Sequence, residues 1–261
     1  MVIPIYCATP DHERRLRATL DSVAAQTYRG FDVIVVDDRS PVDPQPVIES
    51  ISGLPRAKLL RNAANIGHAQ SRNVGIRAAE SELVAFLDHD DLWHPEKLAR
   101  QVDALDRNPD AAMVFCDVEI SGPHKAGLYV DQRTIPERPG LAWFVSRPNS
   151  VITVSSVLVR NQAMQEIRLF DSRYSTCDDF DAWIKLLERA PIVHLRETLA
   201  TYVLHEHNVN YAADRLNDNR LLTGLLLRIL ASSPAALKIA LLPAIARKLA
   251  GRVYFALRTR G

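Results

Sequence analysis

The chain has 261 residues, of which 47% are hydrophobic and 24% are charged, so its composition is that of a globular protein and excludes a disordered one. The net charge is +1, but residues 221–261 hold seven basic residues and no acidic one, which leaves −6 for residues 1–220. An acidic body without interleaved basic and aromatic residues argues against a nucleic-acid partner.

The cysteines and the N-terminus indicate a cytoplasmic protein. Cys7, Cys116 and Cys177 show neither metal-ligand spacing nor a disulfide framework, which suits a reducing compartment. No signal peptide is visible at the N-terminus, and no run of 18 apolar residues predicts a spanning helix.

Short apolar runs alternate with segments of helical periodicity along the first 120 residues. The runs predict strands at residues 2–6, 31–36, 83–87 and 113–118, with helices around residues 16–23, after Gly67 and after Pro95. This alternation predicts an α/β fold with a mostly parallel sheet flanked by helices. Beyond it, residues 119–150 are rich in Pro and Gly and predict a long loop or lid. A strand at 151–159, a helix at 181–188 and helices from 214 onward follow.

Acidic residues follow two of the predicted strands. Asp37 and Asp38 come after one strand, and Asp88 and Asp90 after another. Ligands bind beyond the carboxyl ends of parallel strands, and paired carboxylates suit Mg²⁺ or Mn²⁺. A solvated acidic turn is the alternative for the Asp88 segment, and a backbone-capping turn is the alternative for Asp38.

Three further segments carry candidate functional groups. Asn65 and Gly67 precede a helix whose start suits a phosphate, and Arg72 either pairs with that phosphate or forms a structural ion pair. Asp179 is one of several acidic residues ahead of a predicted helix. Helix capping needs fewer carboxylates than this segment holds, so one of them could act as a general base. His205 is either a metal or diphosphate ligand or a structural histidine.

In this order, these segments resemble the motifs of family 2 glycosyltransferases, inverting enzymes with the GT-A fold. The matching segments are Ile3–Cys7, Leu20–Tyr28, Val35–Ser40, Asn65–Gly75, Phe86–Asp91, Pro95–Leu98, Phe170–Asp171, Asp178–Trp183 and His205–Asn208. The chain departs from the family pattern at Cys7, Arg39, Asp178 and Val203, where the family has Asn, Gly, Glu and often Arg.

The resemblance implies a Rossmann-like GT-A catalytic domain over residues 1–210 and a helical, basic extension over residues 211–261. Asp38 would read the nucleotide base, Asp88 and Asp90 would hold the ribose and the metal–diphosphate, and Asp179 would activate the acceptor. The residues that the resemblance assigns to the sugar nucleotide are Pro4, Tyr6, Asp38, Asn65, Arg72 and Asp88. Those that it assigns to Mn²⁺ or Mg²⁺ are Asp90, Asp88 and His205.

The implied reaction moves a sugar from a nucleoside diphosphate, with UDP favoured, to a hydroxyl of a glycan or lipid-linked acceptor in cell-surface polysaccharide synthesis. The alternative is a catalytically silent module that binds nucleotide sugars, although the presence of Asp90 and Asp179 favours the enzyme. Since no G-x-G-x-x-G follows the first strand, a dinucleotide-dependent oxidoreductase is set aside.

The apolar and basic tail has two interpretations. It predicts peripheral contact with the anionic inner face of a membrane, or packing on the catalytic domain or on a second subunit of a homodimer. The sequence leaves this choice open.

Overall fold

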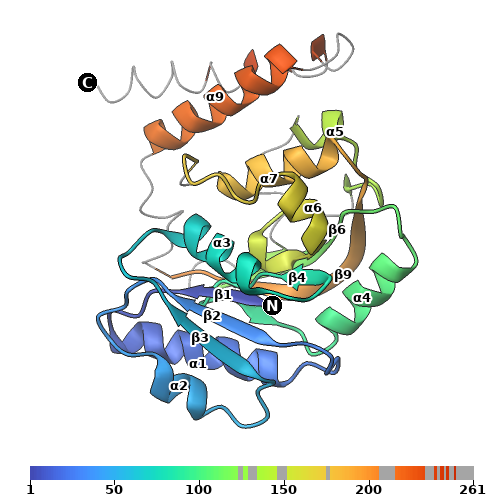
Figure 1. Ribbon diagram of the computed structural model, residues 1–261. Helices are drawn as coiled ribbons and strands as arrows, with labels where there is room; N and C mark the ends of the chain where they lie inside the picture. Colours follow the sequence, from blue (N-terminus) through green and yellow to red (C-terminus); the bar gives the residue numbers. More distant parts are fainter. Residues whose placement is uncertain are drawn as a thin grey trace.

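The computed structural model describes residues 1–122, 126–128, 134–145, 152–174, 177–205 and 215–232, with 238–239, 242–243, 245–246 and 250. Figure 1 shows a sheet layer with helices on both faces and helix α9 lying over α7. The elements in chain order are β1 Val2–Ile5, α1 Pro10–Ala24, β2 Val33–Asp37, α2 Gln45–Glu49, β3 Ala57–Arg61, α3 His68–Ala78, β4 Leu83–Ala85, β5 Leu92–Trp93, α4 Lys97–Asp106, β6 Met113–Ser121, β7 Gly127–Leu128, α5 Leu141–Val145, the 3₁₀ turn Val154–Ser156, β8 Val157–Arg160, α6 Asn161–Glu166, α7 Asp178–Leu187, β9 Ile192–Val203 and α9 Arg215–Ser232.

The strands form a parallel part and a mixed part. Strands β1, β2 and β3 are parallel neighbours in that order. The second part has the order β4-β8-β6-β9-β5; the β6–β9 pair is parallel and the pairs with β8 and β5 are antiparallel. A parallel bridge between Val2 and Phe86 connects β1 to the end of β4. The α/β prediction is therefore confirmed, with antiparallel strands in the second half.

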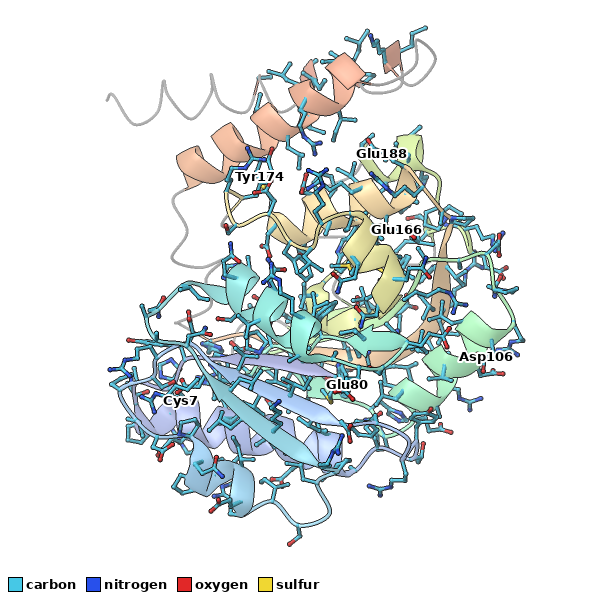
Figure 2. All side chains as sticks on the ribbon, in the orientation of Figure 1. Cys7, Glu80, Asp106, Glu166, Tyr174 and Glu188 are labelled. Carbon is cyan, nitrogen blue, oxygen red and sulfur yellow. The ribbon has the colours of Figure 1, made fainter. Side chains whose placement is uncertain are left out.

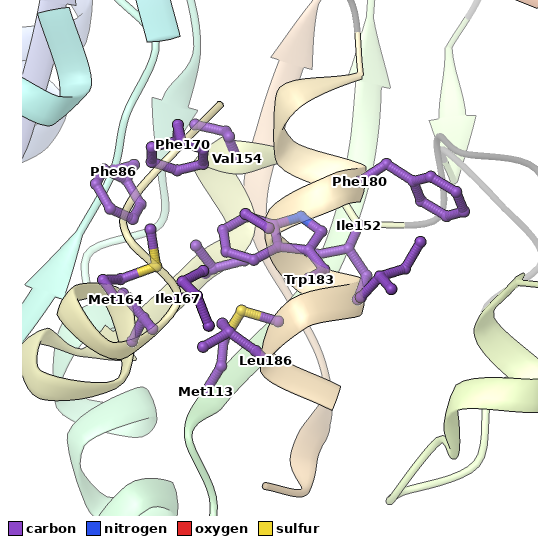
Figure 3. Close-up of a cluster of buried hydrophobic side chains, with 14 of the residues drawn as sticks. Phe86, Met113, Ile152, Val154, Met164, Ile167, Phe170, Phe180, Trp183 and Leu186 are labelled. Atoms are coloured by element: carbon purple, nitrogen blue, oxygen red, sulfur yellow. The ribbon is translucent and has the colours of Figure 1, made fainter. Parts of the chain in front are cut away.

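Both faces of the sheet are buried, because alternate residues of β1, β2, β6 and β8 enter two hydrophobic clusters. Val2 and Val36 belong to the cluster covered by α3, α6 and α7, whereas Ile3 and Val35 belong to the cluster covered by α1 and α4. Figure 3 shows Trp183 of α7 at the centre of the first cluster. This core fixes α7, which carries several of the acidic residues.

Helix α3 approaches β1 closely at Gly75. A Cβ atom built there would lie 2.3 Å from Cγ1 of Val2, so a glycine is needed for this packing. The contact places the N-terminal end of α3 beside the carboxyl ends of β1 and β2, where the acidic residues lie.

Four strands, β3, β5, β7 and β9, were not predicted from the sequence, and several boundaries moved. Strand β3 is partly exposed, and the middle of β9 consists of polar residues, so neither strand shows a strong apolar pattern. The predicted strand at 151–159 is a 3₁₀ turn followed by β8, and the helix predicted at 181–188 begins at Asp178. The segment predicted as a loop at 119–150 holds the end of β6, β7 and α5 among its described residues.

Helix α9 packs on the α/β domain. Leu225, Leu226 and Ile229 are buried in the same cluster as Trp183, and Nη2 of Arg228 donates to Asp181 of α7 at 2.5 Å. Packing on the domain is thus observed for this part of the tail. The predicted boundary at residue 210 lies outside the described residues. Within the part of the chain that is described, no helix has the length and apolar character needed to span a bilayer.

Candidate active site

The candidate site lies where the carboxyl ends of β1 and β2, the turn after β4, and the first residues of α3 and α7 meet. The backbone N–H of Cys7 donates to Oγ of Ser40 at 2.8 Å, which ties the end of β1 to the turn after β2. The turn after β4 and helix α7 are then joined to α3 through a single arginine.

Arg72 of α3 is the centre of this arrangement. Arg72 is only 5% exposed, and its guanidinium donates to Oδ1 of Asp88 at 2.7 Å and to Oδ2 of Asp178 at 3.1 Å. Burial alone would lower the pKa of Arg72, but the charges of Asp88 and Asp178 raise it above its ordinary value. His68 lies 3.2 Å from the other oxygen of Asp178. Arg72 therefore holds the acidic turn and the start of α7 in a fixed relation.

Asp90 and His205 lie together, as the sequence assignment of both to a metal requires. Nε2 of His205, just after β9, lies 2.8 Å from Oδ2 of Asp90. Burial pushes the pKa of Asp90 up, but the His205 hydrogen bond and nearby histidine charge hold it below its ordinary value. Asp90 is thus suited to carry a negative charge.

The donor set fits a hard divalent cation in its chemistry. Asp88 and Asp90 supply carboxylate oxygens, His205 supplies one imidazole, and the Asp88 side chain is 35% exposed and open to a ligand. Within the described residues, however, no three acidic, histidine or cysteine side chains are arranged as a ready metal site. The metal assignment therefore stays a prediction.

Asp91 has a structural position in the same acidic turn. It is buried, and its carboxylate accepts hydrogen bonds from Oγ of Ser155 at 2.6 Å and from the N–H of Val203 at 3.2 Å. Burial, followed by the charges of Asp90 and Asp88, raises the pKa of Asp91 well above its ordinary value. Asp91 and Ser155 thereby connect the acidic turn to β9 and position Asp88 and Asp90.

Asp38 organises the loop that enters α3. One carboxylate oxygen accepts from Nδ2 of Asn62 at 2.9 Å and from the N–H of Ile66 at 2.8 Å. The other oxygen accepts from the N–H of Gly67 at 2.8 Å, at the point where Gly67 takes a φ of 82°. Asn65 is exposed on this loop. Asp38 thus shapes a predicted donor-binding loop, and its contact with a nucleotide base stays a prediction.

The other predicted donor residues lie at the same edge of the sheet. Pro4 is buried inside β1 opposite Val36, and Tyr6, which follows β1, is 42% exposed. Arg39 has a φ of 64°, a left-handed conformation that glycine adopts without cost. This explains why a glycine is expected at this position of the turn.

The three acids at the start of α7 have different environments. Asp178 is buried and paired with Arg72, and Asp181 is buried and paired with Lys185 and Arg228. Asp179 is partly exposed, and one of its oxygens accepts from the N–H of Phe180 at 2.7 Å. Burial, and then the charge of Asp178, raises the pKa of Asp179 to about 7. Of the three, Asp179 has the properties of a general base.

Comparison with known proteins identifies the family. The sequence model of Glycosyl transferase family 2 matches residues 1–164, more than half of the chain. The chain belongs to glycosyl transferase family 2. An uncharacterized glycosyltransferase of Rickettsia typhi is 28% identical over 84% of this chain and 68% of that protein. The amylovoran biosynthesis glycosyltransferase AmsB of Erwinia amylovora is 30% identical over 71% of this chain and 62% of that protein.

Solved structures share the fold. TarS of S. aureus in complex with UDP-GlcNAc has a TM-score of 0.75 at 20% identity, over 95% of this chain and 71% of that one. The mannosyltransferase PcManGT of Pyrobaculum calidifontis has a TM-score of 0.66 at 18% identity, over 97% and 74%. The GT-A fold expected from the sequence is thereby confirmed.

The family 2 motifs thus come together in two contact groups. Arg72, Asp88 and Asp178 form one group, and Asp90 with His205 forms the other. Asn62, which donates to Asp38, and Ser155, which accepts from the N–H of Asp88, contact predicted site residues but were missed, because neither belongs to a motif recognised in the sequence.

Proposed function

We propose that this family 2 protein transfers a sugar from a nucleoside diphosphate, with UDP favoured, to a hydroxyl of a glycan or lipid-linked acceptor in cell-surface polysaccharide synthesis. The observation that carries the proposal is the pairing of the Asp88–Asp90 turn with α7 through Arg72, which brings a candidate donor site beside a candidate base. TarS in complex with UDP-GlcNAc and with UDP, PcManGT in complex with GDP-Man and Mn²⁺, and the amylovoran enzyme support this choice.

The acceptor is activated by Asp179 in this proposal. A carboxylate with a pKa of about 7 is ionised in part at neutral pH and can remove the proton of an acceptor hydroxyl. That oxygen then attacks the anomeric carbon as the bond to the diphosphate breaks, in a single displacement that inverts the centre. Arg72 positions α7, because its ion pair with the neighbouring Asp178 fixes the helix start.

The donor is held by the other site residues in this proposal. Tyr6, Asp38 and the loop of Asn65 would bind the nucleoside, and Asp88 and Asp90 with His205 would hold Mn²⁺ or Mg²⁺. Such an ion neutralises the charge on the leaving diphosphate. Arg72 already pairs with Asp88, which orients that carboxylate beside the proposed cation.

Calorimetric titration with UDP, with and without Mn²⁺, tests the donor site. We expect metal-dependent binding that disappears in Asp90→Ala and persists in Asp103→Ala, whose carboxylate forms an exposed ion pair with Arg107 on α4. Absence of binding to UDP, GDP and dTDP with metal present would contradict the transferase. Normal UDP binding without turnover of any labelled UDP-sugar would instead favour the silent module.

A further inference from the structure

A second pocket lies away from this site, between α3, the segment after α6, α7 and α9. Its volume is about 610 Å³, within the range of small-molecule sites. None of the residues assigned above to the donor, the metal or the base lines it. The pocket is therefore distinct from the candidate active site.

The lining of this pocket is predominantly basic. Its cationic residues are Arg77, Arg168, Arg173, Lys185, Arg189 and Arg228. Three acidic residues face them: Asp171, and Glu166 and Glu188, which are labelled in Figure 2 at the end of α6 and just after α7. The formal charge of the lining is thus positive by three.

The ion pairs inside the pocket leave several cations uncompensated. Arg173 pairs with Asp171, and Lys185 and Arg228 share the single carboxylate of Asp181. Arg77, Arg168 and Arg189 form no ion pair with any residue that the structure describes, and Arg189 donates only to the backbone carbonyl of Lys185. These three guanidinium groups are available to a ligand.

The backbone at Arg168 is held in an unfavourable conformation. Arg168 and Leu169 both have left-handed φ values, 65° and 66°, a conformation that is unfavourable for residues other than glycine. The buried side chain of Leu169 anchors the turn, and the exposed Arg168 lines the pocket. Strain of this kind is concentrated at functional sites.

We propose that this pocket binds a phosphate ester or diphosphate, independently of the donor site. A guanidinium fork matches two phosphate oxygens, and several such forks around one cavity favour a dianion over a simple carboxylate. The phosphate belongs either to a phospholipid headgroup or to a soluble phosphate ester. The inference goes beyond the proposed transfer reaction and does not depend on it.

Titration of the full chain with inorganic pyrophosphate in metal-free buffer tests the pocket. We expect Arg77→Gln/Arg189→Gln to raise the Kd at least tenfold, and Arg107→Gln, which removes an exposed cation just after α4, to leave it unchanged. Both pocket side chains are exposed, so UDP binding with Mn²⁺ should be unaffected and reports an intact fold. No pyrophosphate binding by the wild type, or equal binding by the double variant and the control, would overturn the proposal.

Vesicles separate the two sources of phosphate. If the ligand is a headgroup, the wild type co-sediments with phosphatidylglycerol vesicles and not with phosphatidylcholine vesicles, and the double variant loses this binding. If the double variant no longer binds pyrophosphate but still binds vesicles, the ligand is a soluble phosphate ester.

Discussion

Replacement of Asp179 by Asn should stabilise the fold above pH 7 while it abolishes sugar transfer. The pKa of Asp179 is raised from 3.8 to about 7, first by burial and then by Asp178. At 1.36 kcal/mol per pKa unit, this shift corresponds to at most about 4 kcal/mol. Because the side chain is partly exposed, solvent screening reduces the expected gain to about 1–2 kcal/mol.

The sign of the pH dependence follows from proton binding. Between pH 4 and 7 the folded state keeps a proton on Asp179 that the unfolded state has lost, so the wild type loses stability as the pH rises. Asparagine cannot ionise, and its amide oxygen can still accept from the N–H of Phe180. The stability gain of Asp179→Asn should therefore grow from pH 4 to pH 7 and stay constant above it.

Urea unfolding at pH 5 and pH 8, with a pH–rate profile of the wild type, measures both consequences. We expect kcat/KM to fall about tenfold per pH unit below 7, since only the ionised base is active. Asp171→Asn is a control of opposite sign: the hydrogen bond from Arg173 lowers the pKa of Asp171 below its ordinary value of 3.8. This variant should therefore lose stability, and by the same amount at pH 5 and pH 8, since both lie above that value. A variant Asp179→Asn less stable than the wild type at pH 8 would refute the reasoning.

Four further substitutions test the packing, the backbone and a buried amine. Gly75→Ala should cost about 1–3 kcal/mol in urea unfolding because its Cβ meets Val2, whereas Gly224→Ala in α9 has open space and should gain about 0.5–1 kcal/mol. Arg39→Gly should raise the melting temperature, since it relieves a left-handed φ worth about 1 kcal/mol. Burial lowers the pKa of Lys97 to about 8, so the wild type should gain stability relative to Lys97→Met as the pH rises from 8 to 10.5.

The sequence predicts secondary structure well where residues of one type, such as apolar residues, follow one another along the chain. Strand β2 is a continuous apolar run, and its two terminal acids are visible at once. The contact of Arg72 with Asp178 joins positions 106 residues apart, and no local pattern encodes it. Strand β9 escaped prediction because its polar middle residues are stabilised by pairing with β6 rather than by burial of an apolar face.

The aromatic contacts around α7 constrain how this enzyme could exchange segments with its relatives. The family match ends at residue 164, but Phe86 before that point packs against Phe170, and Phe170 packs against Trp183, with ring centroids 5.2 and 5.9 Å apart. A chimera whose junction lies between residues 165 and 177 takes these contacting aromatic side chains from two different proteins. A chimera designed to alter acceptor choice therefore needs aromatic residues that match on both sides of the junction. Otherwise the whole hydrophobic cluster around α7 has to be exchanged together with the helix.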